Sequence, residues 1–231
     1  MTVTIHNVLA KAPAALDEFK GRTASAPYEE KGVLFSEVFF LQAAVAHLQP
    51  RRICESGRAR GVSTYLLGVC FPEAEIVSIE YDRTSPDVAI AAANLRHSKN
   101  VQCLFGDAQQ MLPDLVKPGD VVVIDGPKHF RALRLAFRIL CQQQPAAVFI
   151  HDCFLGSCER SFLQQGVPGV FFSDDAEFVK RYRHLDEKCW ALRKDMPGTS
   201  SACPTFVKGG ALVTAPLSPV SPTAARCITP F

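Results

Sequence analysis

The sequence predicts an α/β protein in which helices cover both faces of a doubly wound, mostly parallel sheet. Two observations predict this fold class. First, five short apolar runs lie at residues 53–54, 76–79, 101–105, 121–124 and 147–150, and they alternate little with polar residues. Such runs suit strands that are buried on both faces, as in a parallel sheet covered by helices. Second, a segment with helical character separates most of these runs, which is the alternation expected of a doubly wound sheet.

The expected helices follow the spacing of the apolar residues. A short helix is expected at 14–20. A longer one is expected at 33–48, where Leu34, Val38, Leu41, Val45 and Leu48 recur at three- and four-residue spacings before Pro50. Further helices are expected at 61–70, 87–97, 129–143 and 174–185, with a short helical turn at 109–115. Late strands are expected at 188–193 and 210–214.

The bulk composition narrows the class of protein. The 231 residues are 48% hydrophobic, which suffices for one substantial core, and the formal net charge is only +2. A balance so near neutrality gives no footprint for nucleic acid or for an acidic membrane. No run reaches the length that spans a bilayer and no secretory signal opens the chain, so we expect a cytoplasmic protein with reduced cysteines.

The chain is expected to divide into three parts. Residues 1–50 form a helical segment that covers the site, residues 51–214 form the α/β domain, and residues 215–231 form an irregular tail rich in Pro, Ser and Thr. The oligomeric state is left open, with a homodimer as one candidate.

An acidic residue follows each of the five apolar runs: Glu55, Glu80, Asp107, Asp125 and Asp152. In open α/β sheets the ligand binds outside the carboxyl ends of the strands, so these side chains are expected at one crevice. A plainer reading is that acids cap the next helix, which would explain one or two of them. A dinucleotide pyrophosphate prefers backbone N–H groups. S-adenosylmethionine (SAM) instead carries a sulfonium, an ammonium group and several hydrogen-bond donors, so the acid-rich edge favours SAM.

A glycine loop follows the first run. Gly57 and Gly61 are four residues apart, and each permits a tight turn or a close approach. Ser63 is expected in the first turn of the following helix. Ala59 stands where the dinucleotide pattern GxGxxG requires its second glycine, so that pattern is absent. Glu80 ends the next run, where an acid can bind ribose hydroxyls.

Residues 55–152 resemble the class I SAM-dependent methyltransferases, especially the small O-methyltransferases related to catechol and caffeoyl-CoA O-methyltransferases. The matching pieces are ExGxxxGxS at 55–63, IVSIEYD at 76–82, GDA at 106–108 and VVVIDGPK at 121–128. The resemblance implies a Rossmann-like SAM-binding domain and methylation of a hydroxyl group on a small molecule, with no nucleic-acid or membrane partner.

The resemblance also implies roles for the cofactor-binding residues. Gly57 and Ser63 are expected to contact the methionine part of SAM, Glu80 the ribose, and Asp107 with Ala108 the adenine. Glu55, Gly61 and Asp125 complete the predicted cofactor-binding set.

A metal site is a further expectation from the resemblance. In the family, the Asp that ends the fourth strand binds a divalent metal, and a Lys three residues later lies near the reactive oxygen; Asp125 and Lys128 match these positions. The next strand ends in Asp-Asn in the family and in Asp152-Cys153 here, and cysteine is a poor ligand for Mg²⁺. Asp125 and Asp152 are therefore candidates for Mg²⁺ or another divalent cation, with that departure against them. A related branch carries a His-Asp pair similar to His151-Asp152.

Three residues are candidates for the chemistry of an acceptor hydroxyl. Lys128 could take its proton if burial or a nearby cation lowered the pKa of the amine, His129 is a second candidate base, and Asp125 would orient the acceptor. Plainer readings place Lys128 and His129 at a solvated helix start, His151 in the core, and Arg58 and Arg60 on the surface.

Two rival functions share this fold class: an NAD(P)-dependent oxidoreductase, and a protein that binds SAM as a sensor without catalysis. A nucleic-acid methyltransferase is a weaker rival, because neither a basic face nor an Asn/Asp-Pro-Pro-Tyr motif is present. The sequence does not identify the methyl acceptor, which residues 1–32 and 155–169 are expected to grip.

Overall fold

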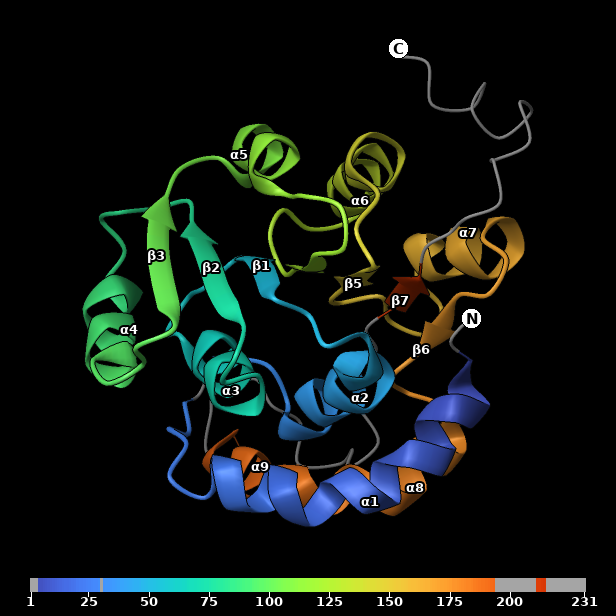
Figure 1. Ribbon diagram of the computed structural model, residues 1–231, viewed down its shortest axis with the longest axis horizontal. Helices are drawn as coiled ribbons and strands as arrows, with labels where there is room; N and C mark the ends of the chain where they lie inside the picture. The colour runs from blue at the N-terminus through green and yellow to red at the C-terminus, as the bar shows by residue number, and fades with distance from the viewer. Residues whose placement is uncertain (1–3, 30, 194–210, 215–231) are drawn as a thin grey trace.

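The computed structural model describes residues 4–29, 31–193 and 211–214, and these residues form a sheet of seven strands in the order β3-β2-β1-β4-β5-β7-β6 (Figure 1). Strands β1 to β5 are parallel, and β7 is antiparallel to both β5 and β6. The strands are β1 Arg52–Ser56, β2 Glu75–Glu80, β3 Val101–Phe105, β4 Val121–Ile124, β5 Ala147–Ile150, β6 Phe171–Phe172 and β7 Ala211–Thr214. The five predicted apolar runs are the five parallel strands, so the predicted fold class is confirmed.

Helices cover both faces of the sheet (Figure 1). They are α1 Ile5–Thr23, α2 Phe35–Val45, α3 Val62–Cys70, α4 Asp87–Leu95, α5 Ala108–Leu115, α6 Phe130–Gln143, α7 Cys158–Gly166, α8 Ala176–Tyr182 and α9 Glu187–Arg193, with 3₁₀ turns at Ala46–Leu48 and Arg183–Asp186. Figure 1 shows α5, α6 and α7 on one side, and α1, α2, α3, α8 and α9 on the other. The N-terminal helix is much longer than predicted, because Thr4 caps it in a capping box with Asn7.

One predicted strand is wrong. Residues 188–193 belong to helix α9, which continues from the 3₁₀ turn Arg183–Asp186. The place beside β5 that a late strand needs is taken by β7, which pairs with β5 from Ala147 to Ile150. Other parts of the sequence predictions, including the tail at 215–231 and two of the nine cysteines, lie outside the described residues.

The core is divided by the sheet into two apolar clusters, one under α1, α2, α3 and α8 and one under α5, α6 and α7. Every residue of α2 is buried, because the sheet lies on one side and α1 and α8 lie on the other. Phe39 packs against Phe19 of α1 at 4.9 Å between ring centroids, and Phe40 packs against Phe178 of α8 at 5.1 Å. Helix α2 is therefore an interior helix, and its side chains are held rigidly above the sheet.

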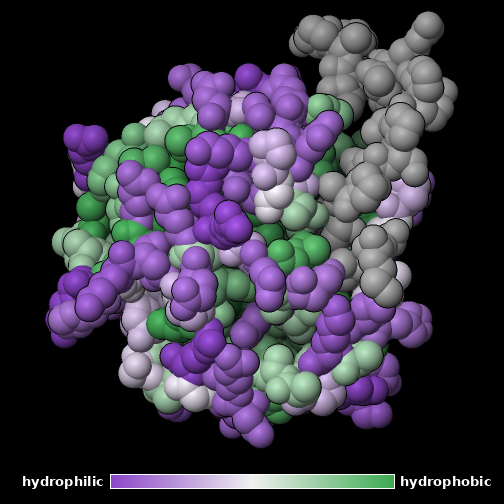
Figure 2. Space-filling model, in the orientation of Figure 1, coloured by the Kyte–Doolittle hydropathy of each residue, from purple (hydrophilic) through white to green (hydrophobic). Residues whose placement is uncertain are grey.

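Among the helices that the structure describes, none combines the length and the apolar character that crossing a bilayer requires. Figure 2 shows hydrophilic side chains over most of the visible face, with hydrophobic residues scattered between them in its coloured part. The division of the chain at residues 50 and 214 stays a prediction.

Candidate functional site

A crevice of about 250 Å³ lies at the carboxyl ends of β1, β4 and β5. Five of the predicted site residues line it: Gly57, Ser63, Asp125, Lys128 and Asp152. Lys31 and Gly32, from the loop before α2, form the opposite wall. The crevice therefore lies where a doubly wound sheet binds its ligand, and the N-terminal segment contributes to it through this loop.

The glycine loop between β1 and α3 forms one side of the crevice. Gly57 has a φ of +85°, and a Cβ added to it would lie 2.8 Å from the backbone carbon of Asp125. Gly61 has a φ of +80°, and a Cβ there would lie 3.3 Å from Ala91 of α4. At Gly57 a side chain would meet backbone atoms that must shift, and at Gly61 it would be strained and tightly packed, so glycine suits both positions. The loop is thereby pressed against the end of β4.

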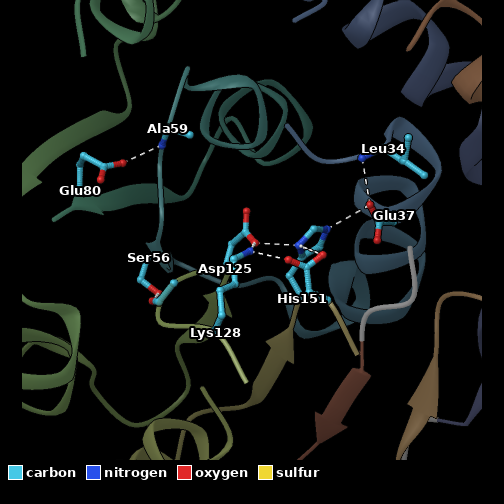
Figure 3. Close-up of polar contacts among 10 residues, drawn as sticks. Leu34, Glu37, Ser56, Ala59, Glu80, Asp125, Lys128 and His151 are labelled. Atoms are coloured by element: carbon cyan, nitrogen blue, oxygen red, sulfur yellow. Dashed lines mark hydrogen bonds and ion pairs between the residues drawn. The ribbon is translucent and has the colours of Figure 1, made fainter. Parts of the chain in front are cut away.

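Glu80, at the end of β2, holds this loop from the side (Figure 3). Its Oε2 accepts a hydrogen bond from the backbone N–H of Ala59 at 2.8 Å, and its Oε1 accepts from the N–H of Tyr81 at 2.8 Å and of Asp82 at 3.3 Å. A carboxylate has about four lone-pair positions, so one remains on Oε2 for a further donor such as a hydroxyl. Glu80 fixes the loop but is not among the residues that line the crevice, so its contact with a ribose stays a prediction.

Glu55 is not among the residues that line the crevice, so the structure gives its predicted contact with the cofactor no support. The side chain is fully buried between β1 and α3, where Oε2 accepts hydrogen bonds from the hydroxyls of Thr64 and Ser78, the second at 2.7 Å. Burial raises the pKa of Glu55 above its ordinary value. The acid that opens the glycine loop is a structural residue that joins β1, β2 and α3.

Asp107 caps the next helix, which is the plainer reading of an acid at the end of a strand. It is the N-cap of α5, and its side chain accepts a hydrogen bond from the N–H of Gln109 at 2.9 Å. Ala108 begins that helix and is buried. Contact of these two residues with an adenine ring stays a prediction.

The two loop arginines are not surface charges. Arg58 is buried, and its guanidinium donates to the backbone carbonyls of Ser78 at 2.8 Å and Leu104 at 3.2 Å, so it ties the glycine loop to β2 and β3. Arg60 is half-buried and forms ion pairs with Asp87 at 2.9 Å and Glu29 at 3.1 Å. Both arginines are engaged in holding the loop.

Two carboxylates and an ammonium group meet at the ends of β4 and β5. Lys128, in the loop after β4, donates to Oδ1 of Asp125 and to Oδ2 of Asp152, the latter at 2.6 Å. Because adjacent parallel strands end side by side, Asp125 and Asp152 come together and the amine bridges them. Figure 3 shows Lys128 beside Asp125.

His151 extends this cluster into the core. Its Nδ1 lies 2.7 Å from Oδ1 of Asp125 and 3.2 Å from Oδ1 of Asp152, and its Nε2 lies 3.3 Å from Oε2 of Glu37. The same Glu37 oxygen accepts from the backbone N–H of Leu34 at 2.9 Å. Figure 3 shows the resulting chain, from the start of α2 through the imidazole to the crevice.

Glu37 is a site residue that the sequence analysis missed. It is almost fully buried in α2, and its side chain reaches across to β5. The signal that could have found it is a single acid within the apolar run at 33–48. A buried carboxyl group needs polar partners inside the protein, so a single acid in an apolar run indicates a polar partner on a neighbouring element.

The charges of the cluster reinforce one another. Burial disfavours the imidazolium, but the charges of Glu37 and Asp125 outweigh it and raise the pKa of His151 well above its ordinary value. In the same way, burial opposes the ammonium of Lys128, but Asp125 and Asp152 raise its pKa. Burial would raise the pKa of each of these two carboxyls, yet His151 and Lys128 lower both. Lys128 is therefore charged at rest, and the condition for its predicted role as a base is not met.

His129 is also placed unfavourably for its predicted role as a base. Its side chain is 82% exposed, and its nearest acidic partner is Glu159 at 3.7 Å. It is not among the residues that line the crevice. The plainer reading, a solvated residue at the start of α6, describes it.

Three residues at the ends of β4 and β5 form a candidate site for a divalent cation. Ligand atoms of Asp125, His151 and Asp152 lie within 4.8 Å of one another, which a metal could bridge. However, Lys128 already bridges the two carboxylates, and both nitrogens of His151 face carboxylate oxygens. Cys153 belongs to the apolar core beneath the crevice. Lys128 thus competes with a metal for both carboxylates, and the predicted metal site at Asp125 and Asp152 stays a prediction.

Comparison with known proteins agrees with this geometry. Residues 49–125 match a family model described as "Putative methyltransferase". The O-methyltransferase TomG from Streptomyces achromogenes, solved in complex with SAM, is 21% identical, with 92% of this chain and 97% of that chain covered and a TM-score of 0.51. The chain has the Rossmann-like methyltransferase fold.

A second solved structure is similar in fold. It is that of cofactor-bound Rv0187 from MTB, which is 22% identical, with 87% of this chain and 89% of that chain covered and a TM-score of 0.50. A search of curated proteins finds no match. The matched family region runs from the residue before Pro50 to Asp125, and so contains the whole glycine loop, Glu80 and one wall of the crevice.

Proposed function

We propose that this protein transfers the methyl group of SAM to an oxygen atom of a small molecule. The observation that carries the proposal is the glycine loop, which is held by Glu80 and pressed against Asp125 at the edge of the crevice. The family match covers this loop, and TomG, a SAM-bound O-methyltransferase, has the same fold.

Groups in the crevice and beside it would complement three parts of SAM. The backbone between Gly57 and Ser63 would receive the methionine part, since no Cβ at Gly57 occupies that space. The remaining lone pair of Glu80 would accept from a ribose hydroxyl. Asp125 would face the cationic end of the cofactor, so its negative charge would favour binding of SAM.

Lys128 would bind the oxygen that receives the methyl group. Its ammonium stands at the mouth of the crevice, where 44% of the side chain is exposed, so an incoming acceptor can reach it. An ammonium group stabilises an oxyanion and does not take a proton from a hydroxyl. An acceptor with an acidic hydroxyl, such as a phenol or an enol, fits this arrangement because it can bind as its anion after losing the proton to water.

The transfer itself then needs only alignment. The oxygen of the bound anion attacks the methyl carbon of SAM, the carbon–sulfur bond breaks with its electron pair going to sulfur, and S-adenosylhomocysteine (SAH) and a methyl ether result. Placement of donor and acceptor supplies much of the acceleration in such an in-line displacement. Asp125 and Asp152 hold the amine of Lys128 from two sides and thereby fix the position of the acceptor oxygen.

The oxidoreductase alternative has less support. The glycine loop lacks the second glycine of the dinucleotide pattern: Ala59 stands there, with its N–H committed to Glu80. A SAM-binding sensor without catalysis shares the cofactor site and differs only in turnover. An activity assay therefore separates it from the proposed enzyme.

We also propose a cellular location and a class of partner for the enzyme. We place it in the cytoplasm, in accordance with cysteines that form no disulfide within the described residues. The near-neutral net charge supports a small molecule as the acceptor and gives no support to nucleic acid. The homodimer stays a prediction.

The test is transfer of tritiated methyl groups from SAM to a panel of catechols, simple phenols and aliphatic alcohols, with SAH affinity measured in parallel. We expect turnover on at least one acidic hydroxyl. Lys128→Met should lower turnover by about 100-fold or more, while the SAH dissociation constant changes little. Binding of SAH without turnover on any acceptor would favour the sensor, and binding of NADH in place of SAH would overturn the proposal.

A further inference from the structure

The cluster at the ends of β4 and β5 has a cation of its own at the point where two carboxylates converge. The Nζ of Lys128 contacts Oδ1 of Asp125 and Oδ2 of Asp152, one from each strand. A divalent cation that bound these carboxylates would have to displace the amine. The lysine is only three residues from Asp125, so its ammonium is a tethered ligand that needs no recruitment from solution.

The imidazole of His151 is equally committed. Its two nitrogens face carboxylate oxygens on opposite sides, Asp125 at 2.7 Å and Glu37 at 3.3 Å. Nε2 makes a hydrogen bond with Glu37, and Nδ1 lies against Asp125 as an ion-pair contact, so a metal on Nδ1 would have to separate the imidazole from Asp125. His151 therefore completes the shell of Asp125 from the core side, just as Lys128 does from the solvent side.

The position after Asp152 supplies no oxygen ligand. Cys153 is 2% exposed and belongs to the apolar cluster under α5, α6 and α7. A thiol is a soft ligand, whereas Mg²⁺ prefers hard oxygen ligands.

We infer that Lys128 occupies the place of a divalent cation in this site, and that methyl transfer proceeds without a metal. The inference rests on the proposed function and defines its chemistry: the acceptor oxygen is bound by one ammonium group in place of a metal ion. It also assigns Glu37 as a positioning residue, which holds His151 against Asp125 from the buried side.

The direct test measures the affinity of the protein for Mn²⁺. Binding is detected as a loss of the electron paramagnetic resonance signal of the free ion. Wild type is expected to leave Mn²⁺ free, and Lys128→Met should bind it about tenfold tighter or more, because the two carboxylates then lack their cation. Lys128→Arg keeps the charge and should behave as wild type. Adding Asp152→Asn to Lys128→Met should abolish the gain, which locates the ion at this site.

Saturable Mn²⁺ binding by wild type that Asp152→Asn removes would overturn the inference, as would equal affinities in wild type and Lys128→Met. If Lys128→Met fails to fold by circular dichroism, Lys128→Gln provides the same comparison. Loss of wild-type turnover with EDTA and its return with Mg²⁺ would also contradict the inference. SAH affinity, measured on the same samples, distinguishes the failure of the proposed function from the failure of the metal-free site. A protein that does not bind SAH refutes the methyltransferase function. Metal binding with normal SAH affinity refutes only the metal-free site.

Discussion

Replacing Gly57 with alanine perturbs the closest backbone approach in the site. The added Cβ would lie 2.8 Å from the backbone carbon of Asp125 and 2.9 Å from the backbone nitrogen of Gly126. Neither atom belongs to a flexible side chain, so the loop or the end of β4 must move. Asp125 would move with it, and both SAH affinity and the hold on Lys128 should decline.

The expected loss in the free energy of unfolding has two parts, backbone strain and a steric clash, and a matched control variant separates them. Alanine at a φ of +85° costs about 1–2 kcal/mol in backbone strain. The clash adds about 1–3 kcal/mol, as is typical of overpacking. Gly119 has a φ of +87° and nothing within 4 Å of an added Cβ, so Gly119→Ala carries the strain alone. The free energy of unfolding should therefore fall by about 2–5 kcal/mol in Gly57→Ala and by about 1–2 kcal/mol in Gly119→Ala.

The assay is urea unfolding of both variants and wild type, with SAH affinity measured on the same preparations. We expect SAH affinity to fall about tenfold or more in Gly57→Ala, the equivalent of about 1.4 kcal/mol, and to stay at the wild-type value in Gly119→Ala. If Gly57→Ala is no less stable than Gly119→Ala and binds SAH normally, the loop is not pressed against β4 and the reasoning fails.

Three further predictions concern other residues. Glu80→Ala removes the acceptor that holds Ala59 and faces the ribose, so SAH affinity should fall about 10- to 100-fold by calorimetry; an unchanged affinity would remove Glu80 from the cofactor site. His129→Asn should retain wild-type turnover, because the side chain is 82% exposed, and a large loss would restore His129 as a base. The pKa of Asp186 is raised to about 6, chiefly by burial, against 3.8 for the ordinary group. When folding raises the pKa of a carboxyl group, its contribution to stability is fully present at pH values below the pKa of the unfolded chain. This contribution is lost as the pH rises through the pKa of the folded protein. Asparagine cannot ionise, so the free energy of unfolding of Asp186→Asn should rise relative to that of wild type by up to about 3 kcal/mol as the pH goes from 4 to 7. Denaturant unfolding at several pH values measures this difference. A difference that does not change with pH would contradict the pKa shift.

The strands were predictable because their signal is local. The runs at 76–79, 121–124 and 147–150 are apolar on both faces, and the structure buries both faces under helices. Helix α2 was harder, since the spacing of Leu34, Val38 and Leu41 suggests one apolar face while the structure buries every side. That burial depends on α1 and α8, which come from distant parts of the chain. Helix α9 failed as a strand for a similar reason, because the position beside β5 was taken by β7.

The candidate site divides in the same way. Gly57 and Asp125 were predictable from the strand-to-loop pattern, and the structure brings them together at the crevice. The direction of a side chain at a strand end was not predictable, so Glu55 was expected to face outward although it is fully buried. The link from Glu37 to His151 joins residues 114 positions apart, and only the packing of α2 on the sheet creates it.

The most direct test of the account is a titration of isotope-labelled protein with SAH, followed by the backbone amide signals in ¹H–¹⁵N spectra. The account predicts saturable shifts concentrated in the glycine loop from Gly57 to Ser63 and at Glu80 and Asp125, with Gly119 unchanged. An absence of shifts at saturating SAH, or shifts confined to residues far from that loop, would contradict the claim that this crevice is the cofactor site.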